Sequence, residues 1–272
     1  MLKFRLVKLL NNLTTLGTVS AMELELLLQT AHSAVENAID ANSFSQPKVT
    51  NFKNTHSGSI DFATETDYSV QSSICEFLAK TKIPVYSEEN NQNEENGVLW
   101  VLDPIDGTLN MEHGLPFYSI SLALIKDGVP ILGVIATPAL GKTIYSGAKS
   151  IGAFKDKAPI RVSDRLNKEA VIAYDGFRGN ELDTFLPKIK QVVARHRLLG
   201  TTATEMALCA EGAFDAVVTP ASKFWDLAAG VALIQAAGGI ALSLDGSKLL
   251  PFSDSVIAGS ESTVLAIINA IN

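Results

Sequence analysis

Apolar residues recur at helical spacing in the first strongly patterned part of the chain. From Leu24 to Ile39 they lie three or four positions apart, which predicts an amphipathic helix that begins near Met22. A second helix is predicted after Asp67, because the apolar residues that follow share one helical face. The segment between the two helices, residues 42–59, is polar and contains proline and glycine, so we expect a loop there.

After Gly97 the pattern changes to that of strands. Apolar runs at residues 98–102, 118–126 and 129–137 predict three strands. The dipeptide Asp127-Gly128 separates the last two, and this pair readily adopts the positive φ angles of a tight hairpin turn. The middle of the chain is therefore expected to form an antiparallel sheet.

Beyond about residue 150, short strands alternate with helices. The expected elements are, in chain order, a strand at 171–174, a helix with apolar residues from Leu182 to Val193, a strand at 216–218, an apolar helix at 226–237 that ends at Gly238-Gly239, a strand at 240–244 and a helix from about Glu261. The pattern predicts an α+β half at residues 22–150 and an α/β half at residues 151–272, packed as alternating layers.

The first residues stand apart from this pattern. Lys3, Arg5 and Lys8 precede a leucine-rich stretch, as in a signal peptide, but Asn11 and Asn12 interrupt the apolar run. We interpret residues 1–21 as an N-terminal extension of unknown role. No uninterrupted apolar run is long enough for a membrane-spanning helix, so we expect no membrane association.

Composition narrows the class of protein. The chain of 272 residues carries 22 Lys and Arg against 29 Asp and Glu, a formal net charge of −7, and no segment supplies the basic face with which a nucleic-acid-binding protein neutralises phosphates. Hydrophobic residues make up 47% of the chain, enough for a large buried core. The two cysteines, Cys75 and Cys209, provide neither a disulfide framework nor a cysteine zinc site, which favours the cytoplasm.

The strongest chemical signal lies at residues 100–110, with the sequence WVLDPIDGTLN. An apolar strand leads to Asp103, the proline behind it stops the strand, and Gly107 permits a sharp turn. Asp103 and Asp106 are then held on a stiff turn, which suits Mg²⁺ because this hard cation needs oxygen ligands in near-octahedral geometry. If a helical turn starts at Gly107 and Thr108, its free N–H groups can hold a phosphate. The same residues also fit an ordinary Asx-capped turn.

Three further acidic segments have two interpretations each. Glu88-Glu89 follows a short apolar run and by itself fits a solvated strand end. Asp226 opens an apolar helix, where it could cap the helix or ligate a metal. The segment from Asp61 to Asp67 could cap the helix that follows.

The joint pattern favours metal ions. Glu88, Asp103, Asp106 and Asp226 all stand at the ends of apolar elements. Their carboxylates would repel one another if they met in the fold, and bound cations would remove that repulsion.

In this order, the four segments resemble the inositol monophosphatase family, which belongs to the lithium-sensitive, magnesium-dependent sugar phosphatases. The similarity extends from about residue 22 to the C-terminus, and the third and fourth motifs are the specific ones. The motifs are residues 61–67, Ser87-Glu88-Glu89, residues 100–110 with His113-Gly114-Leu115-Pro116 behind them, and Trp225-Asp226-Leu227-Ala228-Ala229 running to Ala237-Gly238-Gly239.

The resemblance implies a set of site residues. Two or three Mg²⁺ ions would be bound by Glu88, Asp103, the carbonyl of Ile105, Asp106 and Asp226. Thr108, paired with Asp61, would orient and deprotonate the attacking water, and Glu88 would also take part in catalysis. The Gly107 and Thr108 amides would receive the phosphate, and Asp106, Thr202 and Asp226 would complete the contacts to the substrate.

The resemblance also implies a fold and an activity. The fold would be a layered αβαβα sandwich, the usual assembly a homodimer, and the reaction the Mg²⁺-dependent hydrolysis of a small phosphorylated metabolite such as inositol 1-phosphate by direct attack of water. Thr219 stands about where animal inositol monophosphatases have a glutamate that binds inositol hydroxyls. Fructose 1,6-bisphosphate and 3′-phosphoadenosine 5′-phosphate therefore remain alternative substrates. A regulatory protein that retains the fold is the rival from another class, against which the intact acidic set argues.

Overall fold

The computed structural model describes residues 20–44, 49–54, 60–89, 97–165, 167–176 and 181–272. The side chains of residues 49–54, 60–62 and 167 lie outside the described part, as do residues 1–19 of the predicted N-terminal extension. The described helices are α2 (Ala21–Ala41), α3 (Glu65–Leu78), α4 (Thr108–Glu112), α5 (Glu181–Ile189), α6 (Thr202–Ala210), α7 (Phe224–Ala236) and α8 (Glu261–Ile271), with short 3₁₀ helices η1 (Ala79–Thr81) and η2 (Asn167–Glu169).

The strands form three sheets. The described strands are β1 (Val49–Asn54), β2 (Ile60–Thr64), β3 (Val85–Ser87), β4 (Val98–Asp106), β5 (Ser119–Lys126), β6 (Val129–Thr137), β7 (Thr143–Ala148), β8 (Gly152–Lys155), β9 (Ala158–Ile160), β10 (Val171–Tyr174), β11 (Arg195–Arg197), β12 (Ala216–Thr219), β13 (Ile240–Leu242) and β14 (Val256–Gly259). A seven-stranded sheet has the order β3-β4-β5-β6-β7-β8-β9, a five-stranded sheet has the order β11-β10-β12-β14-β13, and β1 pairs with β2.

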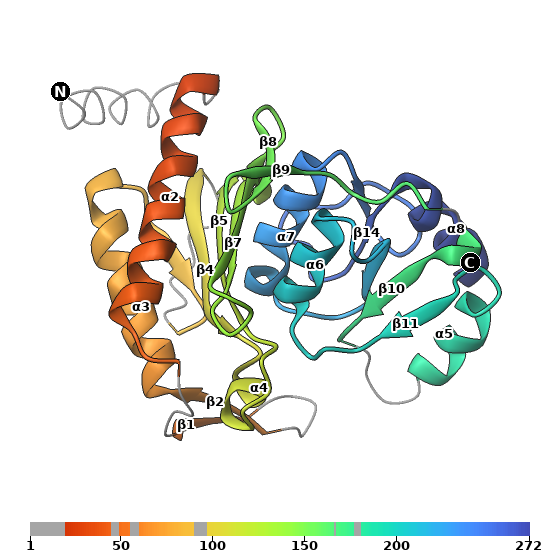
Figure 1. The fold of residues 1–272 in the computed structure, drawn as a ribbon, viewed down its shortest axis with the longest axis horizontal. Coiled ribbons are helices and arrows are strands. Elements are labelled where there is room, and N and C mark those ends of the chain that lie inside the picture. Colours follow the sequence, from red (N-terminus) through yellow and green to blue (C-terminus); the bar gives the residue numbers. More distant parts are fainter. Residues whose placement is uncertain (1–19, 45–48, 55–59, 90–96, 166, 177–180) are drawn as a thin grey trace.

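These elements stack as five layers, which lie side by side in Figure 1. α2 and α3 cover one face of the seven-stranded sheet, α6 and α7 lie between the two large sheets, and α5 and α8 cover the outer face of the five-stranded sheet. The succession of helix, sheet, helix, sheet and helix confirms the predicted layered αβαβα sandwich.

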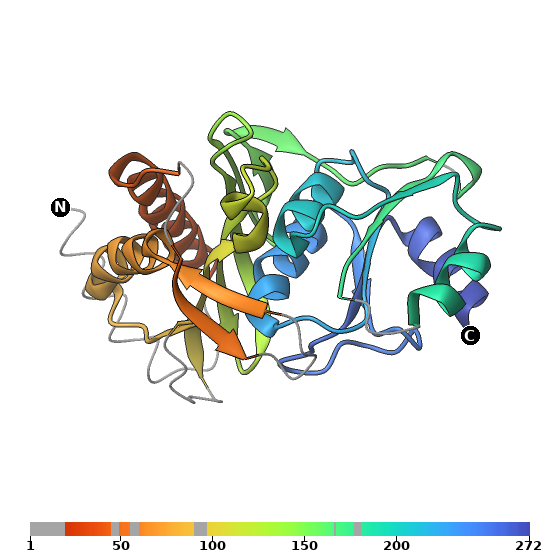
Figure 2. The same cartoon turned by 90° about the horizontal axis from the view of Figure 1, so that it is seen from below.

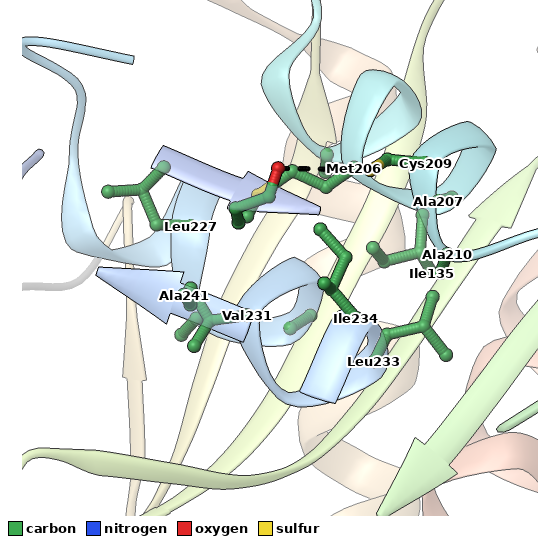
Figure 3. Packing of buried hydrophobic residues seen from close by; sticks show 14 of the residues in the cluster. Ile135, Met206, Ala207, Cys209, Ala210, Leu227, Val231, Leu233, Ile234 and Ala241 are labelled. Atoms are coloured by element: carbon green, nitrogen blue, oxygen red, sulfur yellow. Dashed lines mark hydrogen bonds between the residues drawn. The ribbon is translucent and has the colours of Figure 1, made fainter. Parts of the chain in front are cut away.

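Buried apolar side chains fill the spaces between successive layers. Figure 3 shows part of the central cluster, where Met206 and Cys209 of α6 lie near Ile234 of α7 and Ile135 of β6. The pattern that predicted the first helix reflects this packing, because the apolar face of α2 is buried against the sheet and Ser20 caps its N-terminus in a capping box with Glu23.

A missing side chain lets α7 lie directly on the seven-stranded sheet. A Cβ added to Gly133 of β6 would stand 2.1 Å from the carbonyl oxygen of Ala229 in α7. Only glycine permits so close an approach. This contact fixes the axis of α7 over the sheet, and so fixes where the N-terminus of α7 meets β4 and β5.

The seven-stranded sheet is antiparallel except at one edge, where β3 runs parallel to β4. The predicted hairpin between β5 and β6 is confirmed, since Asp127 and Gly128 have φ angles of 49° and 75°. The predicted boundary at residue 150 falls in the turn between β7 and β8, within this sheet.

Several expected elements are confirmed at their ends. β6 and β10 have the predicted bounds, α8 begins at Glu261, and Gly238 follows α7 with a φ of 87°. α5 ends at Ile189, so the apolar residues that follow it pack beyond the helix.

The prediction of a loop over residues 42–59 is wrong at residues 49–54, which form β1. This strand pairs antiparallel with β2, and the two-stranded sheet lies at the same end of the molecule as α4 (Figure 1 and Figure 2). The polar sequence of the segment hid the strand, because a ladder of backbone hydrogen bonds requires no apolar alternation.

Two helices also differ from the expectation. α3 begins at Glu65 and not after Asp67, because Thr64 and Asp67 form a capping box in which the Thr64 N–H donates to the Asp67 carboxylate over 2.8 Å. α6 was not predicted. The pattern of Thr202 and Glu205 three residues apart, before an apolar run, is the kind of capping signature that could have revealed it, one residue from the observed N-cap Thr201.

Among the described helices, none combines the length and the apolar character needed to cross a bilayer. Cys75 and Cys209 are both free thiols.

Candidate active site

A β-bulge brings the two aspartates of β4 to the same side of the strand. Asp103 pairs with Ser121 of β5, and Asp106 pairs with Ser119. Between these two pairs β4 advances by three residues and β5 by two, so β4 contains one extra residue. Without the extra residue, side chains three positions apart would point to opposite faces of the sheet. The strand also continues through Pro104 to Asp106, where the sequence predicted that it would stop, because a bulge tolerates the missing N–H of proline.

The parallel edge of the sheet supplies Glu88. β3 is paired with β4 so that Ser87 lies opposite Leu102, and the Glu88 N–H donates to the Leu102 carbonyl over 3.1 Å. The carboxyl ends of parallel neighbours meet at one edge of a sheet. Glu88, which follows β3, is therefore brought beside Asp103, which follows Leu102.

Asp226 comes from the first turn of α7. Its carboxylate accepts from the Ser222 hydroxyl over 2.6 Å and from the Lys223 N–H over 3.0 Å. Asp226 therefore stabilises the start of the helix, but from the third helical position, because the N-cap residue is Lys223 and not Asp226. The Ser121 hydroxyl donates to the Trp225 carbonyl over 3.1 Å and ties this end of α7 to β5. Since Ser121 is the pairing partner of Asp103, the tie places Asp226 beside the β4 aspartates.

Asp106 is held from the second half of the chain. Its carboxylate accepts from the Thr201 hydroxyl, from the Ala203 N–H over 2.7 Å and from the Ser119 hydroxyl over 3.3 Å. The first two donors belong to the N-terminus of α6, whose unpaired N–H groups and dipole favour a negative charge. These bonds orient the carboxylate and join the two halves at the site.

The three aspartates lie close enough to share ions. Each of Asp103, Asp106 and Asp226 offers a carboxylate oxygen within 4.8 Å of the others. Burial, followed by the charges of Glu88, Asp226 and Asp106, raises the pKa of Asp103 well above its usual range. Burial and the charge of Asp226 raise the pKa of Asp106 to about 8, against the lowering effect of the Thr201 bond. Burial also raises the pKa of Asp226.

These carboxylates line a cavity of about 220 Å³. The described residues around it are Glu88, Asp103, Ile105, Asp106, Gly107, Thr108, Leu109, Lys223, Trp225 and Asp226. The cavity thus brings together every sequence-predicted site residue except Asp61 and Thr202. Lys223 and Leu109 were not predicted as site residues.

The donor set of this cavity fits a hard divalent cation. It consists of carboxylates and the Ile105 carbonyl, with no histidine or thiol among the described lining residues. Asp103 and Asp106 are 2% and 8% exposed, and none of the ion pairs formed by described residues involves these two aspartates or Asp226. Buried carboxylates without a basic partner carry a large cost that a bound cation would remove. Glu88, Asp103, the Ile105 carbonyl, Asp106 and Asp226 are the residues that would hold it.

The carboxylate that contacts Thr108 is that of Asp67. The Thr108 hydroxyl lies 3.3 Å from Asp67 Oδ1 and 2.9 Å from the Ile105 carbonyl oxygen. The sequence analysis paired Thr108 with Asp61. The Asp61 side chain lies outside the described residues, and its backbone is in β2. The capping box at the start of α3 aims Asp67 at α4, which spacing along the chain could not show.

Thr202 lies apart from the cavity in the described structure. It begins α6, and its hydroxyl donates to Asp175 Oδ2 over 3.0 Å. Its predicted contact with the substrate stays a prediction. Asp175 and its neighbour Glu205 are buried acids that the sequence analysis did not single out, and burial raises the pKa of both.

Glu205 is the more unusual of these two acids. It is 0% exposed, and its Oε1 accepts from the Leu199 N–H over 2.6 Å. Within the described part of the chain, its Oε2 has no hydrogen-bond partner. Burial, followed by the charge of Asp175, raises the pKa of Glu205 to about 9. A charged residue inside a mostly apolar helix carries no sequence signal that distinguishes it from a surface residue.

The sequence of this chain is similar to sequences of known proteins. The sequence model described as the inositol monophosphatase family matches residues 23–271. A protein of Thermotoga maritima named fructose-1,6-bisphosphatase/inositol-1-monophosphatase is 36% identical over 203 residues, which cover 72% of this chain and 77% of the relative. An inositol-1-monophosphatase of Mesorhizobium japonicum is 31% identical over 236 residues, 82% of this chain and 88% of the relative.

A solved structure shares the whole architecture. The extragenic suppressor protein suhB from Bartonella henselae superimposes with a TM-score of 0.78 at 27% sequence identity, covering 93% of this chain and 99% of that one. The likeness therefore includes both large sheets and the helical layers around them.

Proposed function

This chain belongs to the inositol monophosphatase family, whose members are metal-dependent phosphoric monoester hydrolases, and we propose that it hydrolyses the phosphate ester of a small sugar or polyol such as inositol 1-phosphate. We further propose Mg²⁺, as two or three ions, as its cofactor. The observation that carries the proposal is the convergence of Asp103, Asp106 and Asp226, each with an oxygen within 4.8 Å of the others, in a cavity that also contains Thr108.

Bound at these carboxylates, Mg²⁺ would supply Lewis acidity that favours ionisation of a water molecule and stabilises negative charge on the leaving oxygen. The protein's part is to position the reactants. Gly107 and Thr108 line the cavity at the start of α4, where they would receive the phosphoryl oxygens. Gly107 has a φ of 88°, and a Cβ there would stand 2.9 Å from the Phe117 carbonyl oxygen, so the turn requires glycine.

Thr108 and Asp67 would move the proton of the attacking water. A water placed at Thr108 Oγ1 can donate its proton to that oxygen while the hydroxyl donates to Asp67 Oδ1, 3.3 Å away. Burial raises the pKa of Asp67, which makes its carboxylate a better proton acceptor. The oxygen of the water then forms the new bond to phosphorus in line with the leaving oxygen, and the ester P–O bond breaks. The alkoxide takes up a proton from solvent water and leaves as the alcohol, so no covalent intermediate with the protein is needed.

Phosphate release tests this proposal. Purified protein is incubated with inositol 1-phosphate, fructose 1,6-bisphosphate and 3′-phosphoadenosine 5′-phosphate, with Mg²⁺ or with EDTA. We expect Mg²⁺-dependent release that an Asp103→Asn variant loses. Asp183→Asn, the same change at an exposed position on α5, is the matched control and keeps wild-type activity. No release by the wild-type protein, or equal release by Asp103→Asn, contradicts the proposal.

The substrate panel also separates the alternatives. The name of the Thermotoga maritima relative supports fructose 1,6-bisphosphate as a second substrate. The Bartonella henselae protein is named an extragenic suppressor and not a phosphatase, which is why the rival of a regulatory protein that retains the fold is tested as well. A folded protein that binds Mg²⁺ and releases no phosphate from any ester would favour the rival.

We also propose that the chain acts in the cytoplasm as a homodimer, with no nucleic-acid partner. The free thiols of Cys75 and Cys209 support the cytoplasm, and the acidic composition supports the absence of a nucleic-acid partner. The homodimer rests on the resemblance to the inositol monophosphatase family alone. Light scattering coupled to size-exclusion chromatography measures the mass in solution, and a monomeric mass at micromolar concentration contradicts the dimer.

A further inference from the structure

A single basic side chain stands among the described residues that line the acidic cavity. It is Lys223, near Trp225 and Asp226 in the chain. Its side chain is exposed, so it lines the cavity on the solvent side, which we call the mouth. The cavity is otherwise built of carboxylates, backbone and neutral side chains. An ammonium group at this place is opposite in charge to the site around it and to the anionic substrate that the proposed function requires.

The backbone of Lys223 is fixed by the site itself. Lys223 is the N-cap residue of α7, and its N–H donates to Asp226 Oδ2 over 3.0 Å. The side chain can therefore move only about an anchored Cα. Any shift of Asp226 toward bound ions would carry the base of the Lys223 side chain with it.

Its ammonium group has no carboxylate partner in the described structure. Lys223 is exposed, and none of the ion pairs among the described residues includes it. Its Nζ lies 6.0 Å from the centre of the Trp225 ring. That ring packs against Tyr86 of β3 with 5.8 Å between ring centres, so the ring beneath the Lys223 ammonium group is held in place by a second aromatic side chain.

We propose that Lys223 is a substrate-binding residue whose ammonium group holds a non-bridging oxygen of the phosphoryl group that is being hydrolysed. The inference rests on the proposed function. The three aspartates face the cavity from β4 and α7, and ions bound there would hold the phosphoryl group on its inner side. Lys223 supplies a charge-assisted hydrogen bond from the mouth, which the carboxylates cannot provide.

The size of the cavity favours the reacting phosphoryl group over a second anionic group of the substrate. At about 220 Å³ it is smaller than the roughly 300–1,000 Å³ of sites that enclose a whole ligand. A second phosphate on a sugar ring would lie outside it. Lys223 lines the same cavity as Asp106, Gly107 and Thr108, where the reacting group must sit.

Inhibition by inorganic phosphate, the product of the reaction, tests the inference. In Lys223→Ala we expect the inhibition constant of phosphate and the KM of inositol 1-phosphate each to rise about tenfold, the loss expected for one partly exposed charged hydrogen bond. We expect kcat to change by less than about threefold, and the Mg²⁺ concentration for half-maximal activity to stay at its wild-type value. Lys223→Arg should recover most of both losses, because it keeps the charge and the donor groups. Added salt should reduce the difference in KM and in the phosphate inhibition constant between the wild-type protein and Lys223→Ala, because salt screens the lysine charge.

Lys80→Ala is the matched control. Lys80 also lies over an aromatic ring, with its Nζ 3.5 Å from the centre of Phe77, and its loss changes the net charge equally. It follows α3, whose 14 residues place it about 20 Å from Asp67 at the other end of that helix. This variant should keep wild-type constants.

The outcomes separate the inference from the proposed function. If the wild-type protein is active and Lys223→Ala keeps its KM and phosphate inhibition, or loses affinity only for fructose 1,6-bisphosphate, the assignment of Lys223 to the reacting phosphoryl group is wrong. If the wild-type protein releases no phosphate, the proposed function fails. In that case, calorimetric titration with inorganic phosphate in the presence of Mg²⁺ tests whether Lys223 binds a phosphate. Weaker binding by Lys223→Ala than by the wild-type protein supports this role, and equal binding overturns it.

Discussion

Replacing Glu205 by glutamine should reduce the pH dependence of stability, to which the other buried acids also contribute. Glu205 is 0% exposed, its Oε1 accepts from the Leu199 N–H, and its surroundings raise its pKa to about 9 from an ordinary value of 4.5. The folded state therefore favours the neutral carboxyl. A group whose pKa is raised by folding contributes its stability fully below the unfolded pKa and loses it as the pH rises toward the folded pKa.

The magnitude follows from the pKa shift. Each pH unit between the two pKa values costs about 1.4 kcal/mol, so between about pH 5 and pH 8 Glu205 should remove about 4 kcal/mol from the free energy of unfolding. In Glu205→Gln this loss disappears, because an amide keeps the acceptor for Leu199 and does not ionise. The amide brings a second buried donor, which costs about 1 kcal/mol at every pH and leaves the slope unchanged.

Urea unfolding at several pH values measures the difference. The assay is run in EDTA, so that ions bound near Asp106 do not contribute. Glu211→Gln is the matched control, since it makes the same change at the other end of α6, in a part-buried ion pair with Lys155. It should lower stability by up to about 1 kcal/mol and keep the wild-type pH dependence. If Glu205→Gln and the wild-type protein show parallel pH dependence, Glu205 is charged in the fold and the reasoning fails.

Three further results are expected. Asp226→Asn should lower kcat/KM by more than the roughly 100-fold that loss of an outer-shell partner of a metal site can cost. In EDTA the variant should unfold at or above the wild-type temperature, because the amide oxygen still accepts from Ser222 and Lys223 and a repelling charge is removed. Unfolding at a lower temperature would show that stabilising the start of the helix is the main role of Asp226. Arg165→Ala should reduce the free energy of unfolding, measured in urea, by about 2–3 kcal/mol, because it leaves the fully buried Asp215 without its basic partner. Arg161→Ala breaks an exposed ion pair with Asp164 and should reduce it by at most about 1 kcal/mol. Equal losses in the two variants would contradict this account. Gly107→Ala should lower both activity and melting temperature, because an added Cβ stands 2.9 Å from the Phe117 carbonyl oxygen at a φ of 88°, and wild-type values in both assays would refute it.

Much of the architecture follows from local patterns in the chain. The period of the apolar residues located α2 and the last helix, and the Asp127-Gly128 pair located the hairpin between β5 and β6, because these signals arise within a few residues of sequence. The acidic residues at the ends of apolar elements indicated a metal site for a similar reason. Strand and helix ends converge in layered folds, and carboxylates that converge need cations.

Long-range packing decided the rest. Whether Asp103 and Asp106 face the same way depends on a bulge that exists only through pairing with β5, and the acid that reaches Thr108 is Asp67 because a capping box turns it toward α4. The burial of Glu205 depends on a helix enclosed between two sheets. Such contacts join residues tens of positions apart, and no local sequence pattern gives the distance between them in space. The sequence alone therefore determined which chemical groups stand at the ends of the helices and strands. Only the tertiary structure decided which of these groups meet.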